Sequence, residues 1–153
     1  MLFFFICKGG AGLETKDTGN LRTELMKTED IHAFLEENEE SFKTEEFREM
    51  LERLFNKCGL SKAALAKASG MSEVYLHQVF SGRRKPSRNR ILSLCFGLGA
   101  TLEETQSFLR RSACAELYPH NRRDAILIFA LLHAENAVAV NDRLFSEGEE
   151  TLF

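Results

Sequence analysis

The sequence predicts an all-α protein on three observations. No stretch of the 153 residues alternates apolar and polar side chains for long, as a half-buried strand would. Only two prolines interrupt the chain, and apolar residues recur at helical spacing along most of it. A hydrophobic content of 44% is ordinary for a globular chain, and this length can bury one real core or two small ones.

The N-terminal stretch, residues 1–25, is interpreted as a leader without ordered structure. Its opening, MLFFFICKGG, has an apolar run of only about six residues, with no positive charge ahead of it. Such a run is too short to span a bilayer, so we expect no membrane segment. An over-long gene start is an equally good explanation of this leader.

The cysteines and histidines do not have the spacing of a metal site. The cysteines are Cys7, Cys58, Cys95 and Cys114, and the histidines are His32, His77, His120 and His133. No Cys-x-x-Cys or His-Glu-x-x-His pattern occurs among them. We expect reduced thiols in a cytoplasmic protein, with no metal and no cofactor. No signature of a catalytic triad or dyad is present either, which argues against an enzyme.

The first two predicted helices are amphipathic. Thr28 can cap an acidic helix that ends near Glu39, within an N-terminal segment of residues 26–43. Its narrow apolar stripe is Ile31, Phe34 and Leu35. Thr44 can cap a second helix through Cys58, with Phe47, Leu51, Leu54, Phe55 and Cys58 on one face.

Serine and threonine caps define the next four helices. Ser61 begins a short helix to Ser69, Gly70 makes a turn, and Ser72 begins a helix to about Phe80. Ser87 begins another helix, which ends near Gly97 or Gly99. The TLEE sequence that starts at Thr101 is a capping box, in which Glu104 reaches back to the Thr101 amide.

The C-terminal third appears in the sequence as an approximate repeat of the segment before it. RNRILSLCFGLGATLEETQSFLRRSACAELY aligns with DAILIFALLHAENAVAVNDRLFSEGEETLF at an offset of 36 residues, slipping to 35 at the end. The paired residues are Ile91 and Leu127, Leu92 and Ile128, Phe96 and Leu132, Phe108 and Leu144, Leu109 and Phe145, Leu117 and Leu152, and Tyr118 and Phe153. This pattern predicts two stacked helical hairpins, unless amphipathic helices agree by chance.

Charge is strongly segregated along the chain. Residues 1–56 hold 7 basic and 13 acidic side chains, residues 57–90 hold 8 and 1, and residues 91–153 hold 5 and 9. The acidic side chain of the middle segment is Glu73. A solvated surface usually mixes its signs, so the basic middle segment predicts a polyanionic partner.

The basic segment follows a bent helical pair, LSKAALAKASGMSEVYLHQVFSGRRKPS. Gly70 tolerates a turn with positive φ, and small residues at Ala63 and Ala66 allow two helices to cross closely. Leu65, Met71, Leu76 and Val79 supply apolar anchors. Such a unit presents its second helix as a rod that fits the major groove of DNA.

This stretch resembles the helix-turn-helix core of the phage-repressor-like (XRE) family over about Phe47 to Leu109. The whole layout is also similar to helix-turn-helix regulators of anaerobic gut bacteria. The resemblance implies that Ser72 to Phe80 is a recognition helix. Its implied base-contacting residues are Ser72, Glu73, Val74, His77 and Gln78. Its implied phosphate-contacting residues are Lys62, Ser81, Arg83, Arg84, Lys85 and Arg88.

Two residues depart from the family pattern. Glu73 places a carboxylate near DNA phosphates, where it is tolerable only if it accepts a hydrogen bond from a cytosine amino group. Phe80 replaces a polar residue, which predicts that this end of the helix is buried.

The predicted organisation is a repressor-like five-helix domain at residues 44–112 with an added helical hairpin at residues 113–153. We expect a sequence-specific regulator that binds double-stranded DNA as a homodimer, because one recognition unit covers a half-site. The alternative is a non-enzymatic adaptor. Its protein partner would bind the C-terminal hairpin or the acidic N-terminal helix.

Overall fold

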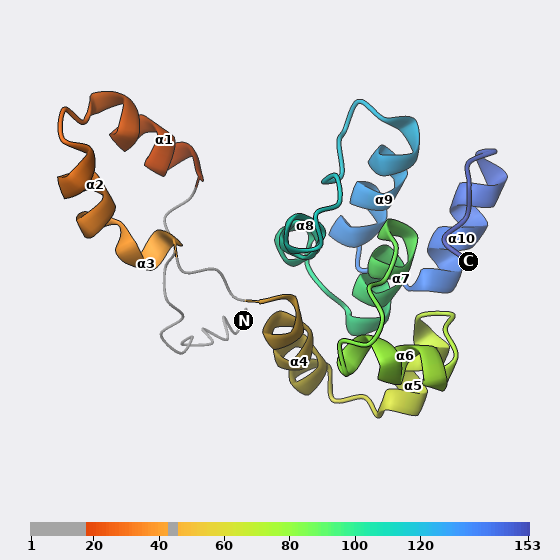
Figure 1. The fold of residues 1–153 in the computed structure, drawn as a ribbon. Coiled ribbons are helices and arrows are strands. Elements are labelled where there is room, and N and C mark those ends of the chain that lie inside the picture. Colours follow the sequence, from red (N-terminus) through yellow and green to blue (C-terminus); the bar gives the residue numbers. More distant parts are fainter. Residues whose placement is uncertain (1–17, 43–45) are drawn as a thin grey trace, which may run out of the picture. The chain divides into compact units, whose positions relative to one another are not determined.

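The computed structural model describes residues 18–42 and 46–153, and all regular elements in these ranges are helices (Figure 1). The all-α prediction is therefore confirmed for this part of the chain. Two compact units, residues 1–44 and 45–153, are described separately below. None of the helices in the described ranges combines the length and apolar character that a bilayer span needs.

The N-terminal unit contains α1 (Thr18–Lys27), α2 (Ile31–Glu37) and α3 (Glu39–Phe42). The expectation of an unstructured leader is wrong for residues 18–25, which are helical; residues 1–17 and Cys7 lie outside the described residues. The α1 sequence TGNLRTELMK has too few apolar residues for a helical periodicity to be recognised.

The α2 helix begins later than predicted because Asp30, not Thr28, is its N-cap. The Asp30 carboxylate accepts hydrogen bonds from the amides of His32 and Ala33, whereas the Thr28 hydroxyl donates to the Asp30 carbonyl. Phe34 is buried and meets Phe42 edge to face, with ring centroids 6.2 Å apart. The other two members of the predicted apolar stripe, Ile31 and Leu35, are exposed.

The second unit contains seven helices within residues 46–153. They are α4 (Phe47–Cys58), α5 (Lys62–Ala68), α6 (Glu73–Phe80), α7 (Arg88–Leu98), α8 (Leu102–Arg111), α9 (Arg122–Leu132) and α10 (Ala137–Ser146). The predicted caps Ser61, Ser72, Ser87 and Thr101 are confirmed, and Thr101 forms the expected capping box with Glu104. The predicted cap Thr44 lies outside the described residues, and α4 has Glu46 as its N-cap.

The α7 helix forms the centre of this unit (Figure 1). All its side chains from Ile91 to Phe96 are buried, and it packs against α4, α5, α8 and α10. The close approach of α5 requires Gly97, because a Cβ there would lie only 2.1 Å from the Ser69 hydroxyl oxygen. The position of α7 thus fixes the end of α5, where the turn toward α6 begins.

Two helical hairpins are present, α7–α8 and α9–α10, but the predicted offset of 36 residues does not describe their helix boundaries. The N-caps Ser87 and Asn121 are 34 residues apart, and the N-caps Thr101 and Asn136 are 35 apart. At an offset of 35, Leu109 corresponds to the equally buried Leu144 rather than to exposed Phe145. The offset error matters because a one-residue slip rotates a helical side chain by about 100°.

The later part of the predicted alignment has the same offset as the structure. Leu117 and Leu152 are both buried, and Tyr118 and Phe153 are both exposed. The Phe96–Leu132 pairing, in contrast, joins a buried residue to one that is 65% exposed. The hairpins are therefore related in architecture, and the first part of the predicted alignment is out of register with the structure.

The described cysteines, Cys58, Cys95 and Cys114, are free thiols. Burial raises the pKa of the Cys95 thiol to about 12, although a hydrogen bond with Thr105 acts in the opposite direction. Cys95 is therefore a neutral core side chain at ordinary pH.

Candidate nucleic-acid interface

The α5 and α6 helices are joined by a tight turn at residues 69–71. The Met71 amide donates to the Ala66 carbonyl at 2.9 Å, and Gly70 adopts a φ of 60° between the two helices. The Ser72 hydroxyl then accepts a hydrogen bond from the Tyr75 amide at 3.2 Å. Gly70 therefore makes the bend that the sequence predicted. Ala66 is buried within it, but Ala63 is exposed and does not line the crossing.

The α6 helix has one buried face and one exposed face. Leu76, Val79 and Phe80 anchor the buried face. Of the predicted base-contacting residues, Ser72, Glu73, Val74 and His77 are exposed and Gln78 is half-buried. Val74 is 68% exposed, so its side chain lies at the surface. The structure therefore brings these five residues to the surface around one short helix.

The C-terminal end of α6 is buried at Phe80, as the apolar residue at this position predicted. Its ring meets Phe55 edge to face, with centroids 5.2 Å apart, and the Lys62 ammonium lies 4.8 Å from the ring centroid. Arg48 donates a hydrogen bond from Nε to the Phe80 carbonyl at 3.1 Å. Phe80 therefore holds two cations from other helices beside the end of α6.

The loop after α6 carries four of the predicted phosphate contacts at the surface. Ser81, Arg83, Arg84 and Lys85 are all exposed. The Arg84 amide donates to the Gln78 carbonyl at 3.1 Å, and its guanidinium lies 5.2 Å from the Tyr75 ring centroid. The basic loop is consequently held against α6 rather than projecting independently.

Arg88 is half-buried and bonded within the protein, away from the role predicted for it. Its Nη2 donates to both carboxylate oxygens of Asp124, at 2.9 and 3.1 Å, and Asp124 is buried. Its Nε donates to the Ala115 carbonyl at 2.9 Å. These contacts tie α7 to α9, so we assign Arg88 to the fold and leave it out of the interface proposed below.

Two arginines that the sequence analysis missed lie beside the basic loop. Arg48 and Arg111 line a hollow of about 210 Å³ together with Arg84 and Lys85. Arg48 and Arg111 come from segments whose overall balance is acidic, so a charge count along the chain could not identify them. The hollow extends the positive surface of the loop.

Arg90, which belongs to the basic segment but was assigned no contact, supports the turn. Arg90 donates from Nη1 to the Gly70 carbonyl at 3.1 Å, and its guanidinium lies 5.4 Å from the Tyr75 ring centroid. Tyr75 therefore has Arg84 and Arg90 near its ring, one from the basic loop and one from α7.

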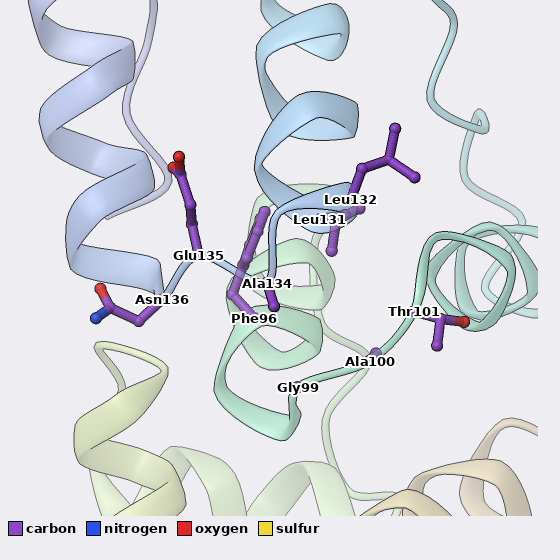
Figure 2. A pocket seen from close by; sticks show the side chains of 9 residues that line it. All are labelled: Phe96, Gly99, Ala100, Thr101, Leu131, Leu132, Ala134, Glu135 and Asn136. Atoms are coloured by element: carbon purple, nitrogen blue, oxygen red, sulfur yellow. The ribbon is translucent and has the colours of Figure 1, made fainter. Parts of the chain in front are cut away.

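A larger hollow, of about 370 Å³, lies where the connections of the two hairpins meet (Figure 2). Its walls come from the end of α7, from Gly99 to Thr101, and from the end of α9 through Asn136. Its ionisable residue, Glu135, is paired with Arg143 on α10. The rest of the lining is mostly apolar, and no second ionisable side chain of the described residues lines the hollow beside Glu135.

The described part of the chain contains no group of three His, Cys, Asp or Glu side chains that could hold a metal ion. Comparison with known proteins gives one positive result. Residues 46–108 match the family model described as a helix-turn-helix domain. They form a helix-turn-helix domain. Neither a curated protein nor a solved structure matches the chain.

The helix-turn-helix domain begins at the N-cap of α4 and continues into α8. It includes the turn at Gly70, the exposed face of α6 and the basic loop. The positive hollow is lined mainly by residues of this domain. The C-terminal hairpin α9–α10 lies outside it in sequence.

Proposed function

We propose that this protein is a cytoplasmic, sequence-specific transcriptional regulator of the XRE type. The observation that carries this proposal is the position of three successive cations, Arg83, Arg84 and Lys85, directly beside the exposed face of α6. Cations beside a protruding helix can bind the DNA backbone while the helix enters the major groove. Binding of this kind needs no catalytic group and no cofactor.

In this proposal α6 is the recognition helix. Glu73, Val74 and His77 face base edges from its exposed side, and Ser72 lies at its N-terminus. Gln78 can bond adenine through its amide. Glu73 is favourable where it accepts from a cytosine amino group, so we expect it to select a C·G pair.

The phosphate contacts in the proposal come from Lys62, Ser81, Arg83, Arg84 and Lys85. They set the affinity and register of the complex, since phosphates carry little sequence information. Two copies would bind two half-sites, because one recognition helix reads only a few base pairs.

A variant pair can separate phosphate contacts from base contacts. Replacing Arg83 and Arg84 by alanine should weaken binding to all duplexes alike and reduce the log–log salt slope by roughly 0.9 per lost contact. Gln78→Ala should instead cost about 1–3 kcal/mol on the preferred site and leave the salt slope nearly unchanged. The measurement is a titration of selected and scrambled duplexes at several salt concentrations.

A matched control removes two arginines from the hairpin. Arg122 and Arg143 lie on α9 and α10, outside the helix-turn-helix domain. Their joint replacement by alanine changes the net charge equally, so a salt slope that falls as much as in the loop variant would contradict the proposed phosphate contacts.

The second candidate function is a protein-binding adaptor, favoured by the exposed apolar side chains of the C-terminal hairpin. These are Phe129, Leu132, Val138 and Phe145. Two of them lie on α9 and two on α10, and large exposed apolar side chains are a feature of many interaction sites. An adaptor would bind DNA weakly and with no preferred duplex, so the same titration distinguishes the two candidates.

A further inference from the structure

The segment after each hairpin is held by an amide side chain of the hairpin's second helix. Gln106 on α8 accepts from the Leu117 amide at 2.8 Å and donates to the Leu117 carbonyl at 2.9 Å. Asn141 on α10, 35 residues later, accepts from the Leu152 amide at 2.7 Å and donates to the Phe153 carbonyl at 3.2 Å. The last residues of the chain therefore follow the same structural pattern as the ordered connection between the hairpins.

Residues 148–153, which we term the closing segment, are also attached to α7 and α9. The Glu150 carbonyl accepts from Arg123 Nε at 2.7 Å, and its carboxylate accepts from Asn89 Nδ2 at 3.2 Å. Arg123 also donates to Asn89 Oδ1 at 3.0 Å. Leu152 is buried in the core. These contacts fix the path of the closing segment across three helices.

This path places the Phe153 ring on the turn of the helix-turn-helix domain. A Cβ at Gly70 would lie 2.7 Å from three carbons of the ring, closer than real contacts allow. Gly70 thus suits the positive φ of the turn, and its lack of a Cβ lets the Phe153 ring lie against the backbone there. On its other sides the turn meets Arg90, which binds the Gly70 carbonyl, and Gly97, which lies against Ser69.

We infer that the closing segment positions the recognition helix for DNA, by covering the turn at Gly70 with Phe153. The direction of α6 relative to α5 depends on the backbone angles of this turn. Arg90 restricts the backbone angles of the turn from the α7 side, and Phe153 restricts them from the α10 side. Removing the ring leaves one side of the turn open, so that orientations of α6 that do not fit the major groove become populated.

The inference rests on the proposed DNA-binding function, but its structural part can be tested without DNA. The amides of Ser69, Gly70 and Met71 donate hydrogen bonds within the turn. Phe153→Ala should speed their hydrogen exchange several-fold in the 153-residue chain, while the amides of α7 stay protected. Phe145→Ala is the matched control, because Phe145 is 78% exposed on α10 and lies outside the closing segment.

The functional part uses the same variants in titrations of the selected duplex. If the competent orientation of α6 falls to about 10–20% of the population, the apparent Kd rises about five- to tenfold. We expect this for Phe153→Ala, a similar change for Asn141→Ala, and no change for Phe145→Ala. The salt slope should stay constant in all three, since no phosphate contact is removed.

The possible outcomes separate the two proposals. Equal turn exchange in wild type, Phe153→Ala and Phe145→Ala would overturn the positioning role, whatever the protein binds. Faster exchange with an unchanged Kd would also overturn it, because the turn would then not control binding. A wild type that does not distinguish selected from scrambled duplexes would contradict the proposed function, and the exchange measurement would still decide whether Phe153 restrains the turn.

Discussion

The two hairpins of the second unit have the same local construction but different surroundings. In each hairpin a residue in the left-handed region, Gly99 or Ala134, precedes the N-cap of the second helix. The α7–α8 hairpin lies among other helices and buries almost all its apolar residues. The α9–α10 hairpin leaves Leu132 and Phe145 largely exposed. Local chemistry therefore determines the shape of a hairpin, whereas its neighbours determine which side chains are buried.

The comparison also shows a division of roles. The first hairpin supports the helix-turn-helix domain from within, through the packing of α7 against α5. The second hairpin acts on the same domain from outside, through the closing segment and Phe153.

The largest expected effect is the loss of folding when the second hairpin is isolated. A fragment of residues 119–153 keeps α9 and α10 but loses the surface that Leu127 and Leu144 bury against. A chain this short cannot bury enough apolar area to fold alone. We expect no cooperative thermal transition by circular dichroism, and a cooperative melt would show that the hairpin is an independent unit.

The next effect compares corresponding core positions of the two hairpins. Leu109 and Leu144 occupy equivalent sites 35 residues apart and are both fully buried. Each leucine-to-alanine change should lower the free energy of unfolding by about 2–5 kcal/mol, measured by urea denaturation. Phe145→Ala, one residue from Leu144, should change it by less than about 0.5 kcal/mol because its side chain is exposed. A large loss for Phe145→Ala would favour the predicted 36-residue offset over the observed 35.

A smaller effect compares the two amide side chains that hold the segments after the hairpins. Gln106→Ala and Asn141→Ala each remove a pair of hydrogen bonds to the backbone. We expect each change to lower the free energy of unfolding by on the order of 1 kcal/mol. Only Asn141→Ala should also weaken DNA binding, since only its segment reaches the turn. Equal losses of DNA affinity in both variants would remove the distinction between the hairpins.

Features determined by adjacent residues were predictable from the sequence. The caps at Ser61, Ser72 and Ser87 were predicted because a serine hydroxyl bonds an amide only two or three positions away. The turn at Gly70 was predictable because glycine itself tolerates the positive φ that the turn needs. The α2 cap was misassigned because Thr28 and Asp30 both have capping side chains, and the carboxylate of Asp30 is the one that reaches the helix amides.

Features that depend on distant partners were not predictable. Arg88 belongs to the basic segment, and its partner Asp124 lies 36 residues away. The contact of Phe153 with Gly70 spans more than half of the chain. The predicted hairpin offset differs from the structure by two residues in the first helices and by one in the second, because apolar residues spaced three or four apart can be aligned in more than one register.

The most direct test of the central claim is a titration of the wild-type protein with duplexes selected from genomic fragments. The claim is that the exposed face of α6 reads sequence while the basic loop binds phosphates. It predicts that a selected duplex binds at least about 10³-fold more tightly than its scrambled version at physiological salt. It also predicts that both affinities fall as salt rises, because both complexes use the same phosphate contacts. Equal affinity for the two duplexes would contradict the claim and favour the adaptor.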